Sequence, residues 1–195
     1  MIPVDCAAIL AGGKSSRMGR EKALIEWGNQ TLIGRVAQVL RPIFSHVCVV
    51  TSNFEVARAA NIPAIPDHFL ARGPVGGIHA ALTHFGAPVF IVACDMPFLN
   101  GEFIRFMAQN FNGDALIPRS ETGIEPLHAI YSPRCAPVLA DLLVHNEKMP
   151  TMGRVIDAFD ARFVETEIAR QFDPNLRCFA NWNTPSDIAE DQRGT

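Results

Sequence analysis

Short apolar runs alternate with helical patterns along this chain of 195 residues, and that alternation limits the folds open to it. The apolar runs are typical of strands that are buried on both faces of a sheet. They lie at residues 6–11, 47–51, 88–94 and 115–118, and the helical patterns lie at residues 32–40, 54–60, 75–85 and 103–111. Because a strand–helix–strand unit makes a right-handed crossover between parallel strands, the pattern predicts an α/β fold. We expect one three-layer α/β/α domain over residues 1–195, with a mostly parallel central sheet.

The composition excludes several classes of protein. A net charge of −3 and an aromatic content of 8% leave no broad basic surface for nucleic acid. No apolar run reaches the length of about 18 residues that a membrane helix needs, and no basic segment of the signal-peptide kind begins the chain. The five cysteines form no C-x-x-C pair, which indicates buried thiols in a cytoplasmic protein rather than a metal site.

A glycine-rich and basic loop follows the first predicted strand. Residues 10–22 read LAGGKSSRMGREK. The paired glycines let backbone N–H groups approach a ligand closely. One acid, Glu21, opposes a set of basic side chains made up of Lys14, Arg17, Arg20 and Lys22. Since the whole chain is acidic, this local excess of positive charge indicates a cradle for a polyphosphate, and a solvated surface loop is the alternative.

Two better-known phosphate loops do not fit this sequence. A P-loop requires a glycine five positions before Gly13, where this chain has Ala8. The dinucleotide fingerprint requires a glycine spacing that Gly12, Gly13 and Gly19 do not provide. The loop therefore predicts a nucleotide site of another kind at the carboxyl edge of the sheet.

An aspartate stands where the third predicted strand ends. Asp95 follows the apolar run at residues 88–94 and precedes Pro97. An ionised carboxylate at this edge can hold Mg²⁺, which then bridges phosphate oxygens of a nucleotide. The alternative is a carboxylate that accepts backbone hydrogen bonds in the turn at Pro97. Beside a phosphate loop at the same edge, the metal role is favoured.

Two further segments place polar residues next to predicted elements. Residues 72–78 follow Asp67 and form a second glycine turn that opens a helix, and close packing is the alternative reason for these glycines. In residues 125–131, Glu125 precedes a short strand in which His128 alternates with apolar residues. We expect His128 to point from the sheet into a cleft, with a structural role as the alternative.

These segments, in this order, resemble the molybdenum cofactor guanylyltransferases, a family of nucleotidyltransferases that make molybdopterin guanine dinucleotide. The family's signature Leu-Ala-Gly-Gly-x-Ser-x-Arg-Met-Gly stands here at residues 10–19, and Lys22 follows it. Four further motifs of the family have counterparts here. They are a Gly-Pro turn at residues 73–78, a strand end with Asp-Met-Pro at residues 94–99, a Glu-Pro-Leu-His stretch at residues 125–131 and a closing Asn-Thr-Pro at residues 183–185. The family most often has aspartate where this chain has Glu21. The resemblance implies a Rossmann-like fold of the nucleotide-diphospho-sugar transferase type.

The resemblance also implies the reaction. GMP is transferred from GTP to the phosphate of molybdenum-bearing molybdopterin, pyrophosphate leaves, and Mg²⁺ is the cofactor. The implied catalytic residues are Lys22, Arg17 and Asp95, with Asp95 as the metal ligand. The implied nucleotide-binding residues are Leu10, Ala11, Gly12, Gly13, Lys14, Lys22, Asn53, Asp67 and Asp95. Within that set Asn53 and Asp67 would contact guanine, and capping of a helix is the alternative role of Asn53.

The acceptor is expected in the second half of the chain. The nucleotide-binding half covers roughly residues 1–110 and the acceptor-binding half roughly residues 111–195. The implied acceptor contacts are Glu125, His128 and Asn183. Three arginines could meet the acceptor's phosphate or be solvated surface, namely Arg119, Arg134 and Arg154. Cofactor-delivery proteins and apo-molybdoenzymes are the further partners implied, and neither nucleic acid nor a membrane is expected.

Two other functions stay open on the sequence. A cytidylyltransferase acting on molybdopterin, or on a sugar or alditol phosphate, would share the first loop and Asp95. It would differ in base selection at Asn53 and Asp67. A non-catalytic molybdopterin carrier would need neither Lys22 nor Asp95, because it has no leaving group to stabilise.

Overall fold

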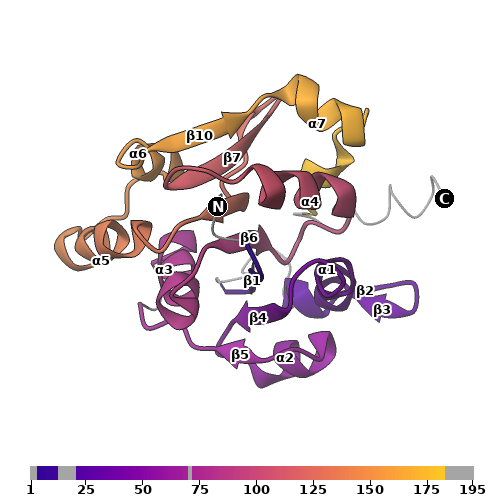
Figure 1. Cartoon of the computed structure of the whole chain (residues 1–195). Coiled ribbons are helices and arrows are strands. Elements are labelled where there is room, and N and C mark those ends of the chain that lie inside the picture. The colour runs from indigo at the N-terminus through magenta and orange to yellow at the C-terminus, as the bar shows by residue number, and fades with distance from the viewer. Residues whose placement is uncertain (1–3, 13–20, 70–71, 183–195) are drawn as a thin grey trace.

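An 8-stranded sheet lies at the centre of the computed structural model, which describes residues 4–12, 21–69 and 72–182 (Figure 1). The strands follow the order β10-β7-β9-β6-β1-β4-β5, and β8 pairs with β7 outside this path. Their bounds are β1 Cys6–Leu10, β4 His46–Val50, β5 Ala64–Ile65, β6 Val89–Ala93, β7 Ala115–Ser120, β8 Gly123–Ile124, β9 His128–Tyr131 and β10 Ala161–Val164. A separate hairpin is formed by β2 (Glu26–Trp27) and β3 (Gln30–Thr31).

The central sheet is mostly parallel, as the sequence predicted. β1 pairs in parallel with both β4 and β6, so that Ala8 lies opposite Cys48 on one side and Ile91 on the other. β5 is parallel to β4, and β10 is parallel to β7. β9 is antiparallel to both β6 and β7, so β7 runs in the direction of β6. The predicted α/β class with a Rossmann-like sheet is therefore confirmed.

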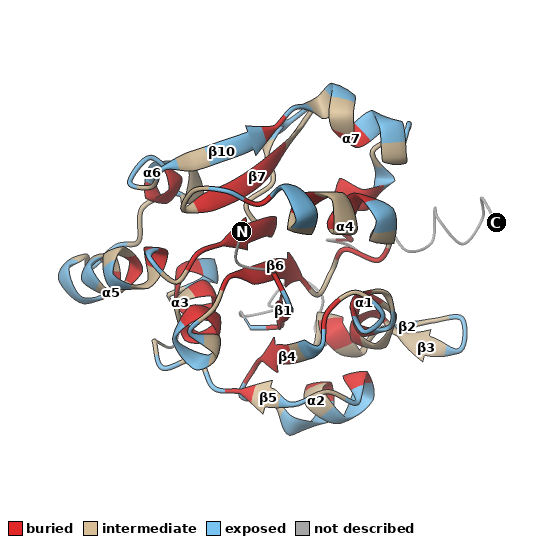
Figure 2. Cartoon of the chain, viewed as in Figure 1, coloured by how far each residue is buried: buried red, intermediate tan, exposed pale blue. Residues whose placement is uncertain are grey.

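Helices cover both faces of the sheet and complete three layers (Figure 1). Their bounds are α1 Leu32–Leu40, α2 Phe54–Ala60, α3 Pro74–Phe85, α4 Gly101–Asn110, α5 Cys135–His145, α6 Met152–Ile156 and α7 Thr166–Phe172. Along β1, Ala7 and Ile9 join the core that contains α1, α2, α4 and α7, whereas Cys6 and Ala8 join the core that contains α3, α5 and α6. This alternation is the two-residue period of a strand buried on both faces. Figure 2 shows the same burial along the whole of β6.

The predicted segments coincide with the elements around the middle of the sheet. Each predicted apolar run overlaps a strand, and each of the four helical patterns overlaps a helix. The sequence did not indicate β10 at the edge of the sheet or the short helices α6 and α7 that flank it. In the described ranges, no helix combines the length and the apolar character needed to cross a membrane.

The start of α4 depends on the side chain of Asn100. Its Oδ1 accepts a hydrogen bond from the backbone N–H of Phe103 at 2.9 Å, which satisfies one of the unpaired donors of the first turn. Its Nδ2 donates to the carbonyl of Phe172 at 2.9 Å, which joins α4 to the end of α7. One residue therefore caps a helix and fastens it to a neighbouring helix.

We predict that Asn100→Ala lowers the free energy of unfolding by about 1–2 kcal/mol, the combined effect of a lost cap and a lost hydrogen bond. Urea denaturation at neutral pH measures the change. Asn110→Ala is the matched control, because Asn110 is exposed and its amide donates only within α4, to the carbonyl of Phe106. Equal effects of the two substitutions would contradict the assigned role of Asn100.

Candidate active site

A lysine and an aspartate that stand 73 positions apart in the sequence meet at the carboxyl edge of the sheet. Lys22 begins the 3₁₀-helix η1 (Lys22–Leu24), and Asp95 follows β6. Nζ of Lys22 donates a hydrogen bond to Oδ2 of Asp95 across 3.3 Å. The two side chains are 20% and 17% exposed, so the pair is sheltered from most water but can still be reached by a ligand. The structure thus brings together two residues that the sequence singled out separately.

Backbone hydrogen bonds between strand ends hold this edge together. The N–H of Cys94 donates to the carbonyl of Leu10 at 3.1 Å, and the N–H of Ala11 donates to the carbonyl of Val50 at 3.1 Å. The ends of β6, β1 and β4 are therefore joined residue by residue. As a result, the loop that follows β1 and the turn that follows β6 begin side by side at this edge.

Within the first loop, residues 10–12 and 21–22 are described, and Gly12 is exposed. Before it, the side chain of Leu10 packs on α3, where a Cβ added at Gly77 would lie 3.0 Å from a methyl carbon of Leu10. Gly13, Lys14 and Arg17 lie outside the described residues, so their contacts with a triphosphate remain predictions.

Asp67 lies against the first turn of α3. Its Oδ1 accepts the N–H of Phe69 at 2.8 Å. A Cβ added at Gly76 would lie 2.8 Å from Oδ2 and 2.9 Å from Oδ1 of Asp67, so this position leaves no room for a side chain. Close packing, the alternative raised for the second glycine turn, therefore accounts for Gly76 and Gly77. The same close packing places the carboxylate of Asp67 beside the start of α3.

Asn53 caps α2, which was the structural alternative for this residue. Its Oδ1 accepts the N–H of Glu55 at 2.9 Å, and its own N–H donates to Oγ1 of Thr51 at 3.1 Å. Capping explains why an asparagine follows β4 here. A contact between Asn53 and a guanine base remains a prediction.

Burial shifts the pKa values of two groups around the end of β6. Burial, together with the neighbouring carboxylates of Asp95 and Glu21, raises the pKa of the Cys94 thiol to about 12. The thiol is therefore neutral at physiological pH and cannot act as a thiolate nucleophile. Burial also raises the pKa of Glu125, while a hydrogen bond from the Ser120 side chain offsets part of that rise.

His128 does not point into a cleft, so that expectation from the sequence is wrong. Its side chain is fully buried on β9, and neither ring nitrogen has a hydrogen-bond partner. The rings of Phe90, Phe103 and Phe179 surround it, with centroids at 5.2, 5.7 and 5.3 Å. Burial lowers the pKa of His128 to about 3, so the imidazole is neutral. A side chain enclosed in this way cannot contact an acceptor, and it belongs to the core.

The other residues predicted for the acceptor are spread over the second half of the chain. Glu125 is partly buried. Two residues later, the carbonyl of Leu127 accepts the N–H of Ala93, the last residue of β6, at 3.1 Å. Two of the arginines are ion-paired: Nε of Arg119 lies 3.4 Å from Glu165, and Nε of Arg134 lies 2.7 Å from Asp114. Arg154 is exposed on α6, and Asn183 lies outside the described residues.

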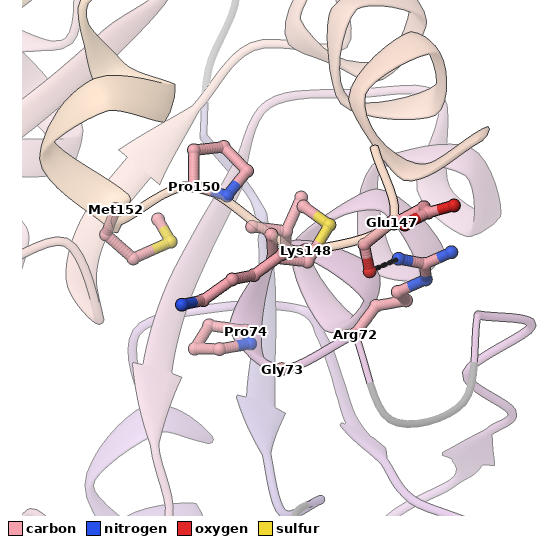
Figure 3. Close-up of a pocket in the computed structure, with 9 residues that line it drawn as sticks. Arg72, Gly73, Pro74, Glu147, Lys148, Pro150 and Met152 are labelled. Atoms are coloured by element: carbon pink, nitrogen blue, oxygen red, sulfur yellow. Dashed lines mark hydrogen bonds between the residues drawn. The ribbon is translucent and has the colours of Figure 1, made fainter. Parts of the chain in front are cut away.

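Two cavities open at this end of the molecule. One, of about 490 Å³, lies between the start of α3 and the segment that joins α5 to α6 (Figure 3). There Arg72 donates hydrogen bonds to the carbonyls of Asn146 and Glu147 at 2.6 and 3.0 Å. The other, of about 570 Å³, is lined by residues on both sides of Lys22, among them Glu21 and Leu24. Of the two, the second is next to the Lys22–Asp95 pair.

The turn after β6 has two neighbours that the sequence did not reveal. Nε of Arg35 on α1 donates to the carbonyl of Pro97 at 2.8 Å, and the N–H of Trp182 donates to the carbonyl of Asp95 at 2.9 Å. Both bonds end on backbone carbonyls, which every residue type carries. No spacing or motif around residue 95 could therefore have indicated them.

Comparisons with known proteins point to one family. The family model described as the MobA-like NTP transferase domain matches residues 7–162. A probable molybdenum cofactor guanylyltransferase of Pelotomaculum thermopropionicum is 38% identical over 187 residues, which cover 93% of this chain and 89% of that protein. The molybdenum cofactor guanylyltransferase of Syntrophotalea carbinolica is 34% identical over 191 residues, with coverage of 96% and 90%.

Two solved structures resemble this chain to different degrees. The molybdopterin-guanine dinucleotide biosynthesis protein A of Archaeoglobus fulgidus superposes with a TM-score of 0.81 at 28% identity, covering 96% of each chain. The 4-diphosphocytidyl-2C-methyl-D-erythritol synthase of Anaerococcus prevotii has a TM-score of 0.69 at 12% identity, covering 98% of this chain and 96% of that one. The second likeness shows a shared fold and no more.

We predict that acid destabilises the protein through His128. Its pKa is about 3 in the folded chain, whereas a histidine in the unfolded chain titrates near about 6.5. Between these values the unfolded chain binds a proton that the folded chain does not, so stability is retained above the higher value and lost as the pH falls. The loss has a slope of up to about 1.4 kcal/mol per pH unit and amounts to about 2 kcal/mol near pH 5.

Urea unfolding of the wild type and of His128→Leu as a function of pH measures this effect. The leucine variant should lose about 2 kcal/mol less than the wild type between neutral pH and pH 5. His84→Gln is the control for the loss of a histidine as such, because His84 is exposed on α3 and lies outside the core. Parallel profiles for the wild type and His128→Leu would show that His128 binds a proton as readily in the folded chain as in the unfolded chain, which would contradict the prediction.

Proposed function

This chain belongs to the MobA-like NTP transferase family, and from that premise we propose that it transfers GMP from GTP to the phosphate of molybdenum-bearing molybdopterin. Molybdopterin guanine dinucleotide and pyrophosphate are the products. The Lys22–Asp95 pair carries the proposal, because it sets a cation and a carboxylate at the edge where the glycine-rich loop begins. Relatives that are named guanylyltransferases support the choice of GTP as the donor.

The proposed reaction is a displacement at the α-phosphorus of GTP. An oxygen of the acceptor's phosphate forms a bond to that phosphorus. The bond from the phosphorus to the bridging oxygen of the β-phosphate breaks, and its electron pair leaves with pyrophosphate. A phosphate monoester is already anionic near neutral pH, so neither a thiolate nor an activated serine is needed. The neutral thiol of Cys94 is consistent with this chemistry. Catalysis then consists of positioning the two phosphates and stabilising charge.

Lys22 is proposed to stabilise the charge that develops around the α-phosphate and the leaving group. Its ammonium is held by the carboxylate of Asp95, and its side chain retains 20% exposure. A cation that is already in place needs no reorganisation when the charge appears. The backbone of Gly12 and Gly13, together with Arg17 and Lys14, completes the proposed triphosphate site.

The carboxylate of Asp95 fits a Mg²⁺ ion that arrives with the nucleotide. Mg²⁺ prefers hard oxygen ligands and is commonly held by one or two carboxylates together with substrate phosphates. Over residues 4–12, 21–69 and 72–182, no group of three or more His, Cys, Asp or Glu side chains could hold a metal ion by itself. A carboxylate that is not part of such a group agrees with an ion shared with the substrate. When bound, Mg²⁺ would neutralise negative charge on the phosphates.

Guanine selection is proposed to rest on Asp67, with Asn53 as a second contact. A carboxylate can accept from both the N1–H and the N2 amino group of guanine, donors that cytosine and adenine do not present in that arrangement. Oδ1 of Asp67 already accepts one bond, from the N–H of Phe69. Carboxylate oxygens have further lone pairs, so that bond does not exhaust the group.

We predict that Lys22→Ala and Asp95→Asn each lower kcat/KM for guanylyl transfer by about 10²–10³, with unchanged thermal unfolding. The double variant should lose less than the product of the two single losses, because the two side chains contact each other. Release of pyrophosphate, measured with GTP, Mg²⁺ and molybdopterin, follows the reaction. Arg105→Ala is the control, since it removes an ion pair with Glu102 that is exposed on α4.

Retention of wild-type turnover by Lys22→Ala and Asp95→Asn would contradict an enzymatic role for the pair. If both variants also delivered cofactor as well as the wild type, the carrier function would replace the transferase.

We predict that the protein binds GTP in preference to CTP, ATP and UTP when Mg²⁺ is present. Asp67→Asn should reduce the preference for GTP over CTP by about tenfold to a hundredfold, the value of one hydrogen bond to a charged group. Calorimetric titration of both proteins measures the four affinities, with Asp141→Asn on the exposed side of α5 as the control. A preference for CTP in the wild type would favour the cytidylyltransferase alternative instead.

A further inference from the structure

We propose that Arg35 and Trp182 are positioning residues that hold the turn at residues 95–98 and thereby set the position of the Asp95 carboxylate. They act through the backbone of the turn and contact neither substrate. The inference rests on the proposed function, because it assigns these residues a part in how Asp95 meets a divalent cation and the nucleotide.

The turn is held through two of its carbonyl groups. The carbonyl of Asp95 accepts the N–H of Trp182 at 2.9 Å, and the carbonyl of Pro97 accepts Nε of Arg35 at 2.8 Å. The donors come from separate parts of the chain, since Arg35 lies on α1 and Trp182 follows the 3₁₀-helix η2 (Arg177–Phe179). Two carbonyls of this short turn are therefore fixed from outside the strand that leads into it.

Aromatic packing reinforces these two hydrogen bonds. The rings of Trp27, Phe98 and Trp182 contact one another edge to face, with centroid separations of 5.4 Å (Trp27–Phe98), 4.9 Å (Trp27–Trp182) and 5.8 Å (Phe98–Trp182). Edge-to-face contacts of this kind add favourable energy beyond the area they bury. Trp182 is only 2% exposed, so its ring anchors the group in the interior.

Two guanidinium groups cover this aromatic group. Cζ of Arg35 lies 4.0 Å from the centroid of the Trp27 ring, and Cζ of Arg177 lies 3.9 Å from that of Phe98. Contacts of this geometry are attractive cation–π interactions. Arg35 therefore joins the ring group to the backbone of the turn, because its face lies over Trp27 while its Nε reaches Pro97. We call the five side chains the aromatic clamp: Trp27, Arg35, Phe98, Arg177 and Trp182.

The clamp connects both halves of the chain to Asp95. Trp27 belongs to the β2–β3 hairpin and Arg35 to the first helix, whereas Arg177 and Trp182 come from the last described segment. A catalytic carboxylate that is displaced by about 1 Å can lose about 10² in rate. Outer groups that orient a metal ligand are commonly worth 10–100-fold in metal affinity. The contacts of the clamp are therefore expected to affect the reaction through the position of Asp95.

Arg35→Gln and Arg41→Gln form a matched pair for the test. Arg35 lies on α1 and Arg41 is the residue that follows its last turn. Both donate to carbonyls of another segment, since Arg41 donates to the carbonyls of Ala60 and Asn61 at 2.6 Å each. Arg41 makes its contacts at the start of the α2–β5 connection, away from the turn at residues 95–98. If loss of any arginine that links two segments weakens metal binding, both variants will show it. If the effect acts through Asp95, only Arg35→Gln will show it.

Metal binding provides a readout that does not depend on turnover. Mn²⁺ can replace Mg²⁺ as the probe, and its free concentration is measured by electron paramagnetic resonance in the presence of GTP. The chain has two tryptophans, Trp27 and Trp182, and both lie in the clamp. Quenching of tryptophan fluorescence by Mn²⁺ therefore reports directly on the distance between the ion and the clamp.

We predict that Arg35→Gln weakens Mn²⁺ binding about tenfold and raises the Mg²⁺ concentration for half-maximal activity by a similar factor. The KM for GTP at saturating Mg²⁺ should change much less. Arg35→Lys, which keeps a cation over Trp27 but not the planar donor, should recover part of the loss. Arg41→Gln should match the wild type in all of these measurements, and tryptophan quenching should disappear in Asp95→Asn.

The possible results separate the inference from the function on which it rests. If the wild type binds Mn²⁺ with GTP and transfers GMP, but Arg35→Gln and Arg35→Lys behave like Arg41→Gln, the positioning role is overturned and the function stands. If the wild type itself neither binds Mn²⁺ nor transfers GMP, the proposed function fails, and the inference fails with it.

Discussion

The parallel pairing of β1 with both β4 and β6 is the constraint on which the rest of this molecule depends. Hydrogen bonds at the strand ends, from Cys94 to Leu10 and from Ala11 to Val50, bring three loops to one edge of the sheet. The meeting of Lys22 with Asp95 follows from that alignment. The same alignment explains why small residues are needed where α3 approaches the edge, since Gly77 makes room for Leu10. The position of the site is therefore a property of the sheet rather than of any single loop.

Charge and burial are divided between the edge and the interior. At the edge, Lys22 and Asp95 are exposed enough for a ligand to reach them. The proposed function requires this, because Lys22 would contact the nucleotide and Asp95 the metal ion. Just below, burial keeps the thiol of Cys94 and the imidazole of His128 neutral. Because these core groups are neutral, they add no charge to the electrostatic environment of Lys22 and Asp95. The unpartnered nitrogens of His128 reduce stability in acid, but they do not take part in the chemistry.

The turn after β6 is the point where distant parts of the fold act together. It is reached by α1 through Arg35, by the segment after η2 through Trp182, and by the β2–β3 hairpin through the ring of Trp27. The segment that leads into the reversed strand β9 also supports it, because the carbonyl of Leu127 accepts the N–H of Ala93, the last residue of β6. An edge that must hold a carboxylate in a defined position is thus supported by both halves of the chain.

The sequence by itself determined the fold class and the residue types of the candidate site, because both depend on local patterns. Apolar runs predicted the central strands, and glycines with basic residues marked the first loop. Asp95 was recognisable because it ends a buried strand. The orientation of His128 was beyond reach, since alternation in a strand does not say which face a helix covers, and here α4 and η2 enclose it. The partners of Lys22 and Arg35 were decided by tertiary structure alone, because they depend on how strands and helices far apart in the chain are paired and packed.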